Sequence, residues 1–466
     1  MSRAAALIWV LIALILGLVV WVTTPRTVLP SASAQFLPDF SPGQVSQIEI
    51  AWPGGETASL ARSDSRWILQ SHASKNAPST GSASASPPWP AESSRVQGLL
   101  RLVAEAQDGG DARAMPTAIF MTFTRDSGEP IRLAIDPSTL GGSGRIARLT
   151  TDGRVQSVAS VDEQFVRALD STSIETWRSK DLLFWPAEAT TAFDSRIGNS
   201  KIELAKSGGA WIMHAPIATK ADAGTVEGSL LLLSRSSFDR FLSATSPNEG
   251  AWKDPARVIR LASRSNAATN RRDIEQTIEV GPAIDTASRM VRITARDLAA
   301  NSVLWGPEVA IMSSATLEAI PSTPSAFVSR IALDLPAADI GSIAIESAGQ
   351  TAIVKRTPGG TFSEADATIR DLLRLLSESP ASQIKVLESP VSPAAVLAAD
   401  SIRIRPLGPS SEPLGEFTLK AASVASKVSG APSVPAIEVT DRSVARSIPW
   451  QRPADFLATL RAIKPR

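Results

Sequence analysis

The chain has 466 residues, with 47 Lys and Arg against 46 Asp and Glu, so its net charge of +1 lacks the basic excess expected of a nucleic-acid-binding protein. It contains no Cys, which excludes disulfides, thiolate metal sites and cysteine nucleophiles, and its only two His are His72 and His214. At roughly 100–200 residues per domain, the length predicts about three domains.

The first predicted element is a membrane-spanning helix. Residues 4–22 carry no charge and no Pro, and at about 1.5 Å per residue such a helix matches the roughly 30 Å core of a bilayer. Residues 1–24 are therefore predicted to be an anchor and 25–38 a linker, in a single-pass protein of the cytoplasmic membrane whose bulk faces the periplasm or the exterior. The alternative is a cleaved signal peptide ending near Ala32-Ser33-Ala34. The side chains expected to contact the lipid bilayer are Leu7, Trp9, Leu11, Leu14, Leu16, Leu18 and Trp21.

Three stretches farther along the chain share one helical pattern. Each has apolar residues at positions i, i+4, i+6 and i+7, starting at Val96, Val226 and Ile369. Positions i, i+4 and i+7 lie on one face of a helix, so each stretch is predicted to be an amphipathic helix with that face buried. An acidic residue near each start suits the helix N-terminus as a cap or as a partner of the helix dipole. These acids are Glu92, Asp222 and Asp366.

A pattern of three strands precedes each helix. Alternating apolar residues stand around Gly pairs, as is typical of β-hairpins. An aromatic residue recurs just after the last turn as Trp67, Trp211 and Phe362, and its recurrence favours a core position over a ligand-stacking one. The residues predicted to form the repeated core are Trp67, Val96, Leu100, Trp211, Val226, Leu230, Phe362, Ile369 and Leu373.

The repeats define the predicted organisation of the chain. The run from Trp177 to Pro186 aligns without a gap with the run from Phe327 to Pro336, which indicates a hand-over between units. The predicted repeat units are 39–180, with a Ser/Ala/Pro-rich insert at 71–90, then 181–333 and 334–466. Each unit is expected to combine antiparallel β-hairpins with one longer packed helix, which is an α+β fold.

Taken together, these features resemble a bacterial domain-of-unknown-function family of repeat-containing, single-pass envelope proteins. Its members are associated with the auxiliary subunits of gliding-motility-type ABC transporters. The resemblance implies a transporter-associated or structural role in the cell envelope, with other membrane proteins as partners, and it supplies no catalytic residues. The matching residues are Ile48, Ile50, Gly54, Gly55 and Trp67 in the first copy and Ile202, Leu204, Gly208, Gly209, Trp211, Pro216, Ala221, Asp222, Val226, Leu230 and Leu233 in the second.

A search for chemistry assigns no catalytic, cofactor-binding or metal-binding residue. The sequence lacks G-x-S-x-G, phosphate-loop and dinucleotide motifs. Ser382-Gln383-Ile384-Lys385 matches S-x-x-K, but the companion motifs of penicillin-binding enzymes are missing. His214 has no counterpart in the other copies and is expected at a surface. Five Trp outside the repeated aromatic position are candidates for a stacking surface, although ordinary packing is favoured for them. Trp89, flanked by Pro, is the one expected to be most exposed; the others are Trp52, Trp252, Trp305 and Trp450.

Three functional hypotheses follow. The first is a non-enzymatic accessory or scaffold protein of an ABC-type transport system. The second is a module that binds cell-wall polymer or polysaccharide, which requires exposed aromatic residues. The third is a hydrolase with two carboxylates, which requires paired acids of raised pKa in a cleft.

Overall fold

The computed structural model describes residues 36–63, 66–73, 88–108, 118–136, 144–161, 169, 174–242, 249–264, 273–362, 366–387, 397–425 and 432–463. The chain divides into two compact units, Met1–Ser179 and Lys180–Arg466. The first unit holds one antiparallel sheet and the second holds two.

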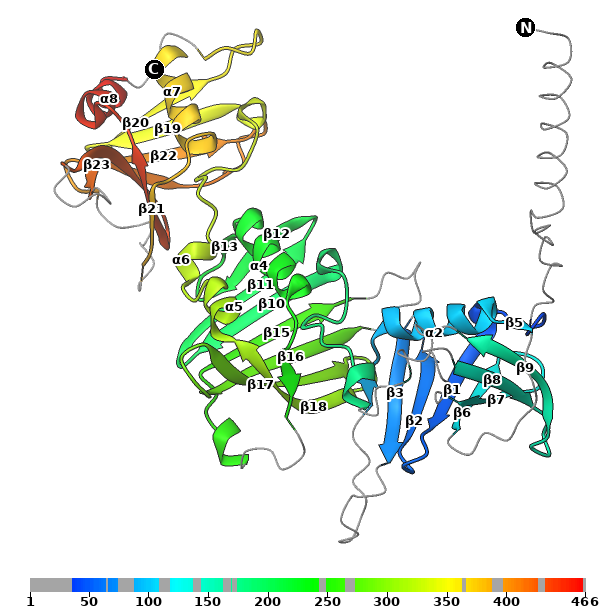
Figure 1. Ribbon diagram of the computed structural model, residues 1–466. Helices are drawn as coiled ribbons and strands as arrows, with labels where there is room; N and C mark the ends of the chain where they lie inside the picture. The colour runs from blue at the N-terminus through cyan, green and yellow to red at the C-terminus, as the bar shows by residue number, and fades with distance from the viewer. Residues whose placement is uncertain are drawn as a thin grey trace, which may run out of the picture. The chain divides into compact units, whose positions relative to one another are not determined.

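Three antiparallel sheets of nine, nine and seven strands dominate the described residues (Figure 1). Strands account for 48% of the described residues, so the predicted α+β class is wrong and the fold is mostly β. The physical reason lies after each long helix, where four further strands form a meander. In these stretches apolar residues alternate with polar ones, as in Ser288–Asp297, where Val291, Ile293 and Ala295 are buried and the residues between them are polar, and this period favours a strand with one buried face over a helix.

The first sheet begins with a hairpin-rich segment and ends with a meander. Its strands are β1 Val45–Ala51, β2 Thr57–Ser63, β3 Arg66–Ala73, β4 Trp89–Pro90, β5 Gln107–Asp108, β6 Ile119–Arg125, β7 Ile131–Asp136, β8 Gly144–Leu149 and β9 Val155–Val161. They are ordered β4-β3-β2-β1-β6-β7-β8-β9-β5. The long helix α2, Ser93–Glu105, follows β4 and precedes β5, so the chain crosses from one edge of the sheet to the other through this helix.

The second sheet has the same order. Its strands are β10 Thr190–Ile197, β11 Ser200–Ser207, β12 Ala210–Ala215, β13 Thr219–Lys220, β14 Arg240–Phe241, β15 Arg257–Ser263, β16 Ile274–Ala283, β17 Ser288–Asp297 and β18 Ser302–Ser313. They are ordered β13-β12-β11-β10-β15-β16-β17-β18-β14. Even the register shift recurs, between Val45 and Gln47 of β1 and between Thr190 and Ala192 of β10, which fixes how the two sheets align residue by residue.

The third sheet lacks the two strands at one edge. Its strands are β19 Ser342–Ser347, β20 Gln350–Lys355, β21 Gln383–Val386, β22 Ile402–Leu407, β23 Phe417–Val424, β24 Val434–Asp441 and β25 Val444–Pro449. They are ordered β20-β19-β22-β23-β24-β25-β21. Among the described residues, β20 therefore has a strand on one side only.

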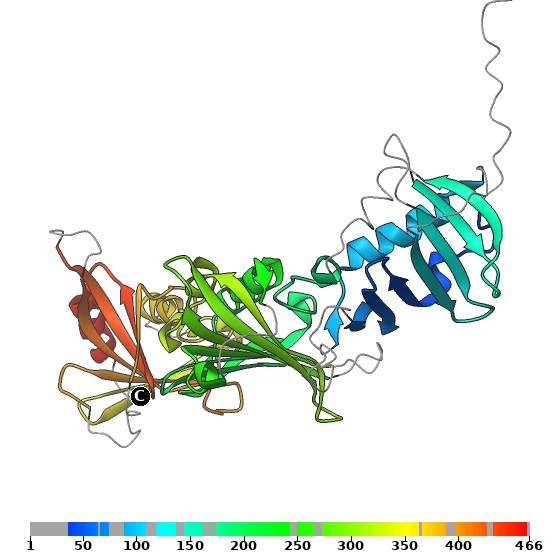
Figure 2. The same cartoon turned by 60° about the horizontal axis from the view of Figure 1, so that its bottom comes forward.

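One long helix packs on one face of each sheet (Figures 1 and 2). These helices are α2, α4 Ala223–Arg235 and α7 Asp366–Ser377. The nine residues predicted to form the repeated core are all buried, with Trp211 only 1% exposed. The shorter helices are α5 Ser314–Ala319, α6 Pro324–Phe327 and α8 Pro453–Arg461, and the 3-10 turns are η1 Pro42–Gln44, η2 Ile174–Trp177, η3 Ala187–Ala189, η4 Glu249–Trp252 and η5 Ala337–Asp339.

The helix starts differ in how they are capped. The Asp222 carboxylate accepts a hydrogen bond from the Thr225 backbone N–H at 2.7 Å, so it caps α4 as the sequence predicts. Glu92 stands at the same position before α2, but its side chain makes no cap bond and instead accepts from the Ser94 hydroxyl at 2.6 Å. The longer Glu side chain suits this geometry less well than Asp.

The predicted transmembrane helix requires a correction. Residues 4–22, with all seven proposed lipid contacts, lie outside the described residues. In the part of the chain that the structure does describe, no helix is long and apolar enough to cross a membrane. The longest of those helices have 13 residues and one polar face, and about 20 Å of helix is too short for a bilayer core. The single-pass anchor and the localisation in the cytoplasmic membrane are therefore not retained.

Candidate functional site

The second joint, residues 327–333, is the candidate functional site. It lies within the unit Lys180–Arg466 and links the second sheet to the third. The Phe327 carbonyl accepts from the Asp222 N–H at 2.7 Å, and the Ser329 N–H donates to the Lys220 carbonyl at 3.0 Å. This half of the joint therefore lies antiparallel to the edge of the second sheet, at the start of α4.

The other half of the second joint is bonded to the third repeat. The Arg330 carbonyl accepts from the Ala381 N–H at 3.0 Å, and the Leu333 N–H donates to the Leu376 carbonyl at 2.8 Å, at the end of α7. One short segment thus ties the beginning of one long helix to the end of the next. Backbone groups that would otherwise be unsatisfied at a helix terminus are satisfied in this way.

Two ionic groups reinforce the second joint. Arg446, only 1% exposed, donates through Nε to the Ser329 carbonyl at 3.0 Å and through Nη1 to the Asp441 carboxylate at 2.5 Å. Lys220 forms an ion pair with Asp334. The Arg446 contact is buried, so water screens it little and its loss would leave buried polar groups unpaired.

The run from Trp177 to Leu183, the first joint, makes equivalent bonds. In the unit Met1–Ser179, the Trp177 carbonyl accepts from the Glu92 N–H at 2.9 Å, and the Ser179 N–H donates to the Pro90 carbonyl at 2.8 Å. These bonds repeat, position by position, those that Phe327 and Ser329 make in the second joint. The structure therefore gives a physical basis to the alignment of the two runs in the sequence.

The remaining part of the first joint belongs to the unit Lys180–Arg466. The Lys180 carbonyl accepts from the Phe238 N–H at 2.8 Å, and the Leu182 N–H donates to the Ser236 carbonyl at 3.0 Å, just after α4. Within this unit, Lys180 and Leu182 thus pair with the segment that follows α4, as Arg330 and Leu333 pair with residues at and after the end of α7.

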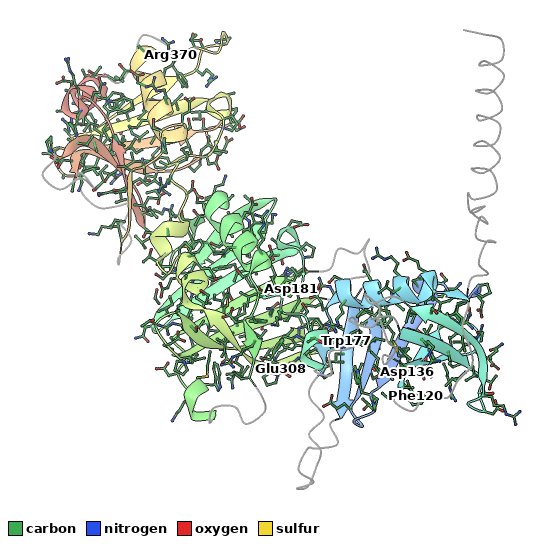
Figure 3. The ribbon with its side chains drawn as sticks, viewed as in Figure 1. Phe120, Asp136, Trp177, Asp181, Glu308 and Arg370 are labelled. Carbon is green, nitrogen blue, oxygen red and sulfur yellow. The ribbon has the colours of Figure 1, made fainter. Side chains whose placement is uncertain are left out.

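Two Trp side chains pack around the first joint in the unit Met1–Ser179. Trp177, labelled in Figure 3, is fully buried, and the Arg95 guanidinium lies 4.8 Å from the centre of its ring. Trp89 Nε1 donates to the Ser179 carbonyl at 2.9 Å, and the Arg178 guanidinium lies 5.2 Å from the Trp89 ring. Burial lowers the pKa of Arg95. Cation–π contacts of this kind contribute about 0.5–2 kcal/mol each.

The expectation that Trp89 is exposed is wrong, because it is 1% exposed. The short strand β4 holds it against β3, and the first joint covers it from the other side. Of the other four Trp that were candidates for a stacking surface, three are also buried, and Trp450 packs on Phe456 with ring centres 5.1 Å apart. These buried residues are Trp52, Trp252 and Trp305. The aromatic residues considered for polysaccharide stacking thus serve the core instead.

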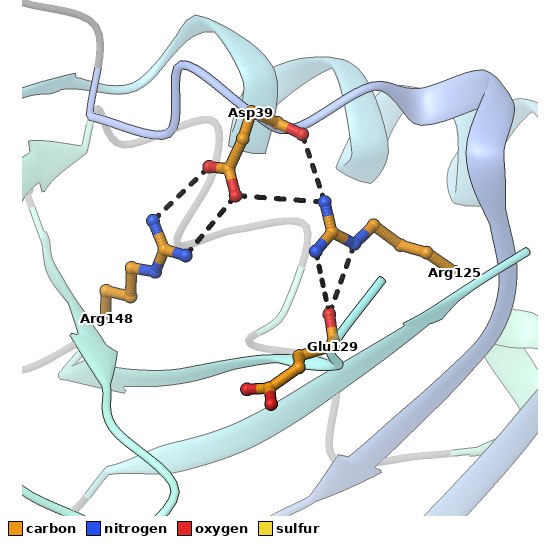
Figure 4. A network of polar contacts seen from close by, with 4 residues as sticks. All are labelled: Asp39, Arg125, Glu129 and Arg148. Carbon is orange, nitrogen blue, oxygen red and sulfur yellow. Dashed lines mark hydrogen bonds and ion pairs between the residues drawn. The ribbon is translucent and has the colours of Figure 1, made fainter. Parts of the chain in front are cut away.

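A polar network fastens the segment before β1 to the meander of the first sheet (Figure 4). The Asp39 carboxylate accepts from Arg148 at 3.3 and 3.4 Å, and the Asp39 carbonyl accepts from Arg125 at 3.2 Å. Arg125 also donates to the Glu129 carbonyl at 2.8 Å. The network lies at the surface, so its net contribution to stability is modest.

Two carboxylates face each other on the second sheet. Asp194 of β10 is the register partner of Glu203 of β11, on the face opposite to the buried Phe193. Burial is the main cause that raises the pKa of Asp194 to about 6, and the charge of Glu203 raises it further, against Lys201 and Arg260. A carboxyl group with such a pKa suits proton transfer near neutral pH.

The two carboxylates are not a repeated feature. By register, Asp194 and Glu203 correspond to Glu49 and Ser59 in the first sheet. Lys201 forms an ion pair with Glu203, and Arg260 is the register partner of Asp194 on the next strand. Two neighbouring basic side chains thus partly compensate the charge of the pair, which favours a structural role over a catalytic one.

Sequence reasoning missed a buried cation. Arg257 of β15 is 7% exposed and donates to the Ser195 hydroxyl at 3.0 Å and to the carbonyls of Leu317, Ile320 and Pro321 at 2.8–3.1 Å. Burial lowers its pKa to about 10. The carbonyls belong to the end of α5, where the helix dipole favours a positive charge.

The other residues considered for chemistry lie apart. His214 is exposed at the end of β12. Ser382 donates to the Ser447 carbonyl at 3.0 Å, which is a strand-edge contact at β21. The side chain of His72 lies outside the described residues.

No family model, curated protein or solved structure matches this chain.

Proposed function

We propose that the chain is a non-enzymatic scaffold protein that acts as an accessory component of an ABC-type transport system. The observation that supports a scaffold is the second joint. Its seven residues hydrogen-bond to the start of α4 with one half and to the end of α7 with the other. Direct backbone coupling of neighbouring repeats is the means by which repeat proteins hold a row of units in a fixed relation, ready to bind partners together.

The transporter as the partner class rests on the resemblance in the sequence alone. The repeat architecture supports a protein-binding role, since repeat proteins offer extended surfaces to partners. The aromatic residues outside the repeated position pack in the protein, so they do not favour a carbohydrate as the ligand. The alternative of polysaccharide binding loses Trp89, its principal residue, to the core. The alternative of a hydrolase rests on Asp194 and Glu203 alone, and the basic side chains of Lys201 and Arg260 partly compensate their charge.

The test is recovery of the tagged full-length chain from its native cells after mild crosslinking, followed by mass spectrometry. Stoichiometric recovery of an ABC permease and its ATPase supports the proposal. Recovery of the chain without transporter subunits overturns it.

A pair of variants asks whether the second joint matters to that recovery. Arg446→Met removes the buried donor to the Ser329 carbonyl and should reduce recovery of the subunits several-fold. Arg374→Met changes an exposed Arg in the last turn of α7 and should leave recovery unchanged. Equal recovery with both variants, when both are folded, would show that the coupling of repeats is not what the partner requires.

A further inference from the structure

The three repeats can be aligned at a single pair of residues on the second strand. Arg62 is the register partner of Trp67, Lys206 of Trp211, and Arg356 of Phe362. In the first two sheets the aromatic residue begins a full strand, β3 or β12, that runs back along the second strand. The third sheet keeps the aromatic position, since Phe362 is buried.

In the third sheet no strand follows Phe362 among the residues that the structure describes. The bridge between Arg356 and Phe362 is the last described pairing before α7, which already begins at Asp366. In the second repeat, by contrast, β12 and β13 stand between Trp211 and the start of α4 at Ala223. The edge of β20 thus corresponds to a position that is filled in both other sheets.

The composition of β20 differs from that of the two covered strands. Ala352 and Val354 point into the core and are 4% and 6% exposed, whereas Ile353 points to the other face and is 53% exposed. By register, Ile353 corresponds to Ser59 and Glu203, which are polar in the sheets whose edge is covered. The strand contains no Pro, and its one charge, Lys355, stands at its end, so the residues from Gln350 to Val354 lack the charge or Pro that protects an edge from pairing.

The covered sheets show what fits beside β20. Opposite the residues that correspond to Val354, the covering strands supply Leu69 and Met213, both buried. We propose that the edge of β20 binds an extended segment of a partner protein, antiparallel to Gln350–Lys355. The segment places a large aliphatic side chain opposite Val354 and a second apolar one over Ile353. This mode is strand addition, in which backbone hydrogen bonds give affinity and alternate side chains give specificity. The proposal rests on the proposed scaffold function and names the surface that receives the partner.

A second copy of the chain fills the position less well. If two β20 strands paired so that their Ile353 side chains met, Ala352 of one copy would stand opposite Val354 of the other. An Ala would leave empty the space that Leu69 and Met213 fill in the covered sheets. A partner segment with a larger residue avoids this cavity.

The experiment uses the full-length chain and a labelled peptide with the sequence of its own residues 208–217, the segment that forms the covering strand of the second repeat. Binding is followed by fluorescence anisotropy, and its place by hydrogen exchange. We expect slower exchange at residues 350–355. Ile353→Lys should weaken binding at least tenfold, because it places a charge where the apolar contact forms. Val303→Lys, at a residue 50% exposed on β18, is the matched control and should leave binding unchanged. A peptide carrying Met213→Pro should not bind.

Three results would overturn the proposal: no slowing of exchange at 350–355, equal binding by the Ile353→Lys variant, or a dimer in sedimentation velocity that this variant dissociates, which would make a second copy the occupant. The outcome is separable from that of the crosslinking test. If transporter subunits are recovered equally with Ile353→Lys, the scaffold function stands and the edge is not the binding surface. If the peptide binds at β20 but no transporter subunit is recovered, the edge stands and the partner class is wrong.

Discussion

The second and third sheets belong to one compact unit, and each packs against one long helix, but their interiors hold charged residues at different positions. One corresponding pair of positions shows this difference. In the second sheet Ser195 and Arg257 meet inside the core, whereas the corresponding residues of the third sheet are Ile345 and Ile402. The first sheet has Ile50 and Ile119 there. The buried cation occurs where α5 ends against the strand and offers its carbonyls. One framework therefore accepts either an apolar pair or a charged group, provided that a neighbouring element satisfies the charge.

The variant Arg257→Met tests this difference between the two sheets and is expected to have the largest effect on stability. The variant leaves the carbonyls of Leu317, Ile320 and Pro321 buried without a donor. We expect the free energy of unfolding of the second repeat to fall by about 3–5 kcal/mol. Urea titration followed by hydrogen exchange resolves this repeat from the others. The control is Ile402→Val at the apolar position of the third sheet, which should cost about 1 kcal/mol. Similar losses for both variants would mean that Arg257 acts only by filling space.

A second pair of variants compares two glycines of positive φ, one inside strand β18 of the second sheet and one in a turn of the third. Gly306 adopts a φ of +80°, and a Cβ atom there would lie 2.3 Å from the Ile293 carbonyl oxygen. Gly349, in the turn between β19 and β20, has a φ of +76° with nothing within 4 Å. Gly306→Ala is expected to cost about 3 kcal/mol, through both strain and overlap, and Gly349→Ala about 1 kcal/mol, through strain alone. Thermal unfolding measures both. Equal costs would show that the backbone relieves the overlap at Gly306.

The comparison extends to the helix starts. Asp222→Ala removes the hydrogen bond to the Thr225 N–H and should cost about 1 kcal/mol. Glu92→Ala, before α2, removes no cap bond and should cost less than about 0.5 kcal/mol. Hydrogen exchange in the first turns of α4 and α2 is the measurement. A cost for Glu92→Ala as large as that for Asp222→Ala would point to the helix dipole rather than the cap as the source of stability.

The sequence predicts the repeated elements well because their signals are local. The period of the apolar residues identifies the helices at Val96, Val226 and Ile369, and the recurring aromatic position identifies the third strand of the first two copies. The third strand predicted for the third copy is wrong, because no strand follows Phe362 among the described residues. The amount of β-structure is missed because each meander is a series of short strands whose pairing depends on distant residues. Trp89 is misjudged for a similar reason, since a Pro-flanked residue becomes buried only when Ser179 returns to pair with it.

The functional surfaces depend even more on contacts between distant residues. Arg257 stands on an alternating strand, and nothing in its own neighbourhood shows that the carbonyls of α5 lie beside it. The open edge of β20 has a partial signal: Phe362 stands too near the helix of the third copy for another strand to fit. That shortening is visible in the sequence once the three copies are aligned on their aromatic residues, but its meaning requires the strand order.

The smallest effect concerns pH and separates the second sheet from the third, where Ala344 occupies the position of Asp194. Burial raises the pKa of Asp194 in the folded chain from its usual value of 3.8 to about 6. The folded state therefore binds more protons than the unfolded state between pH 4 and 6, and this group makes stability fall as pH rises through that window. Because Asp194 is only partly buried, solvent screening reduces the effect to about 0.5 kcal/mol. Asp194→Asn should remove this part of the pH dependence and stabilise the second repeat slightly at pH 7, as measured by urea titrations at pH 4 and 7. An unchanged pH dependence would mean that Asp194 is not its source.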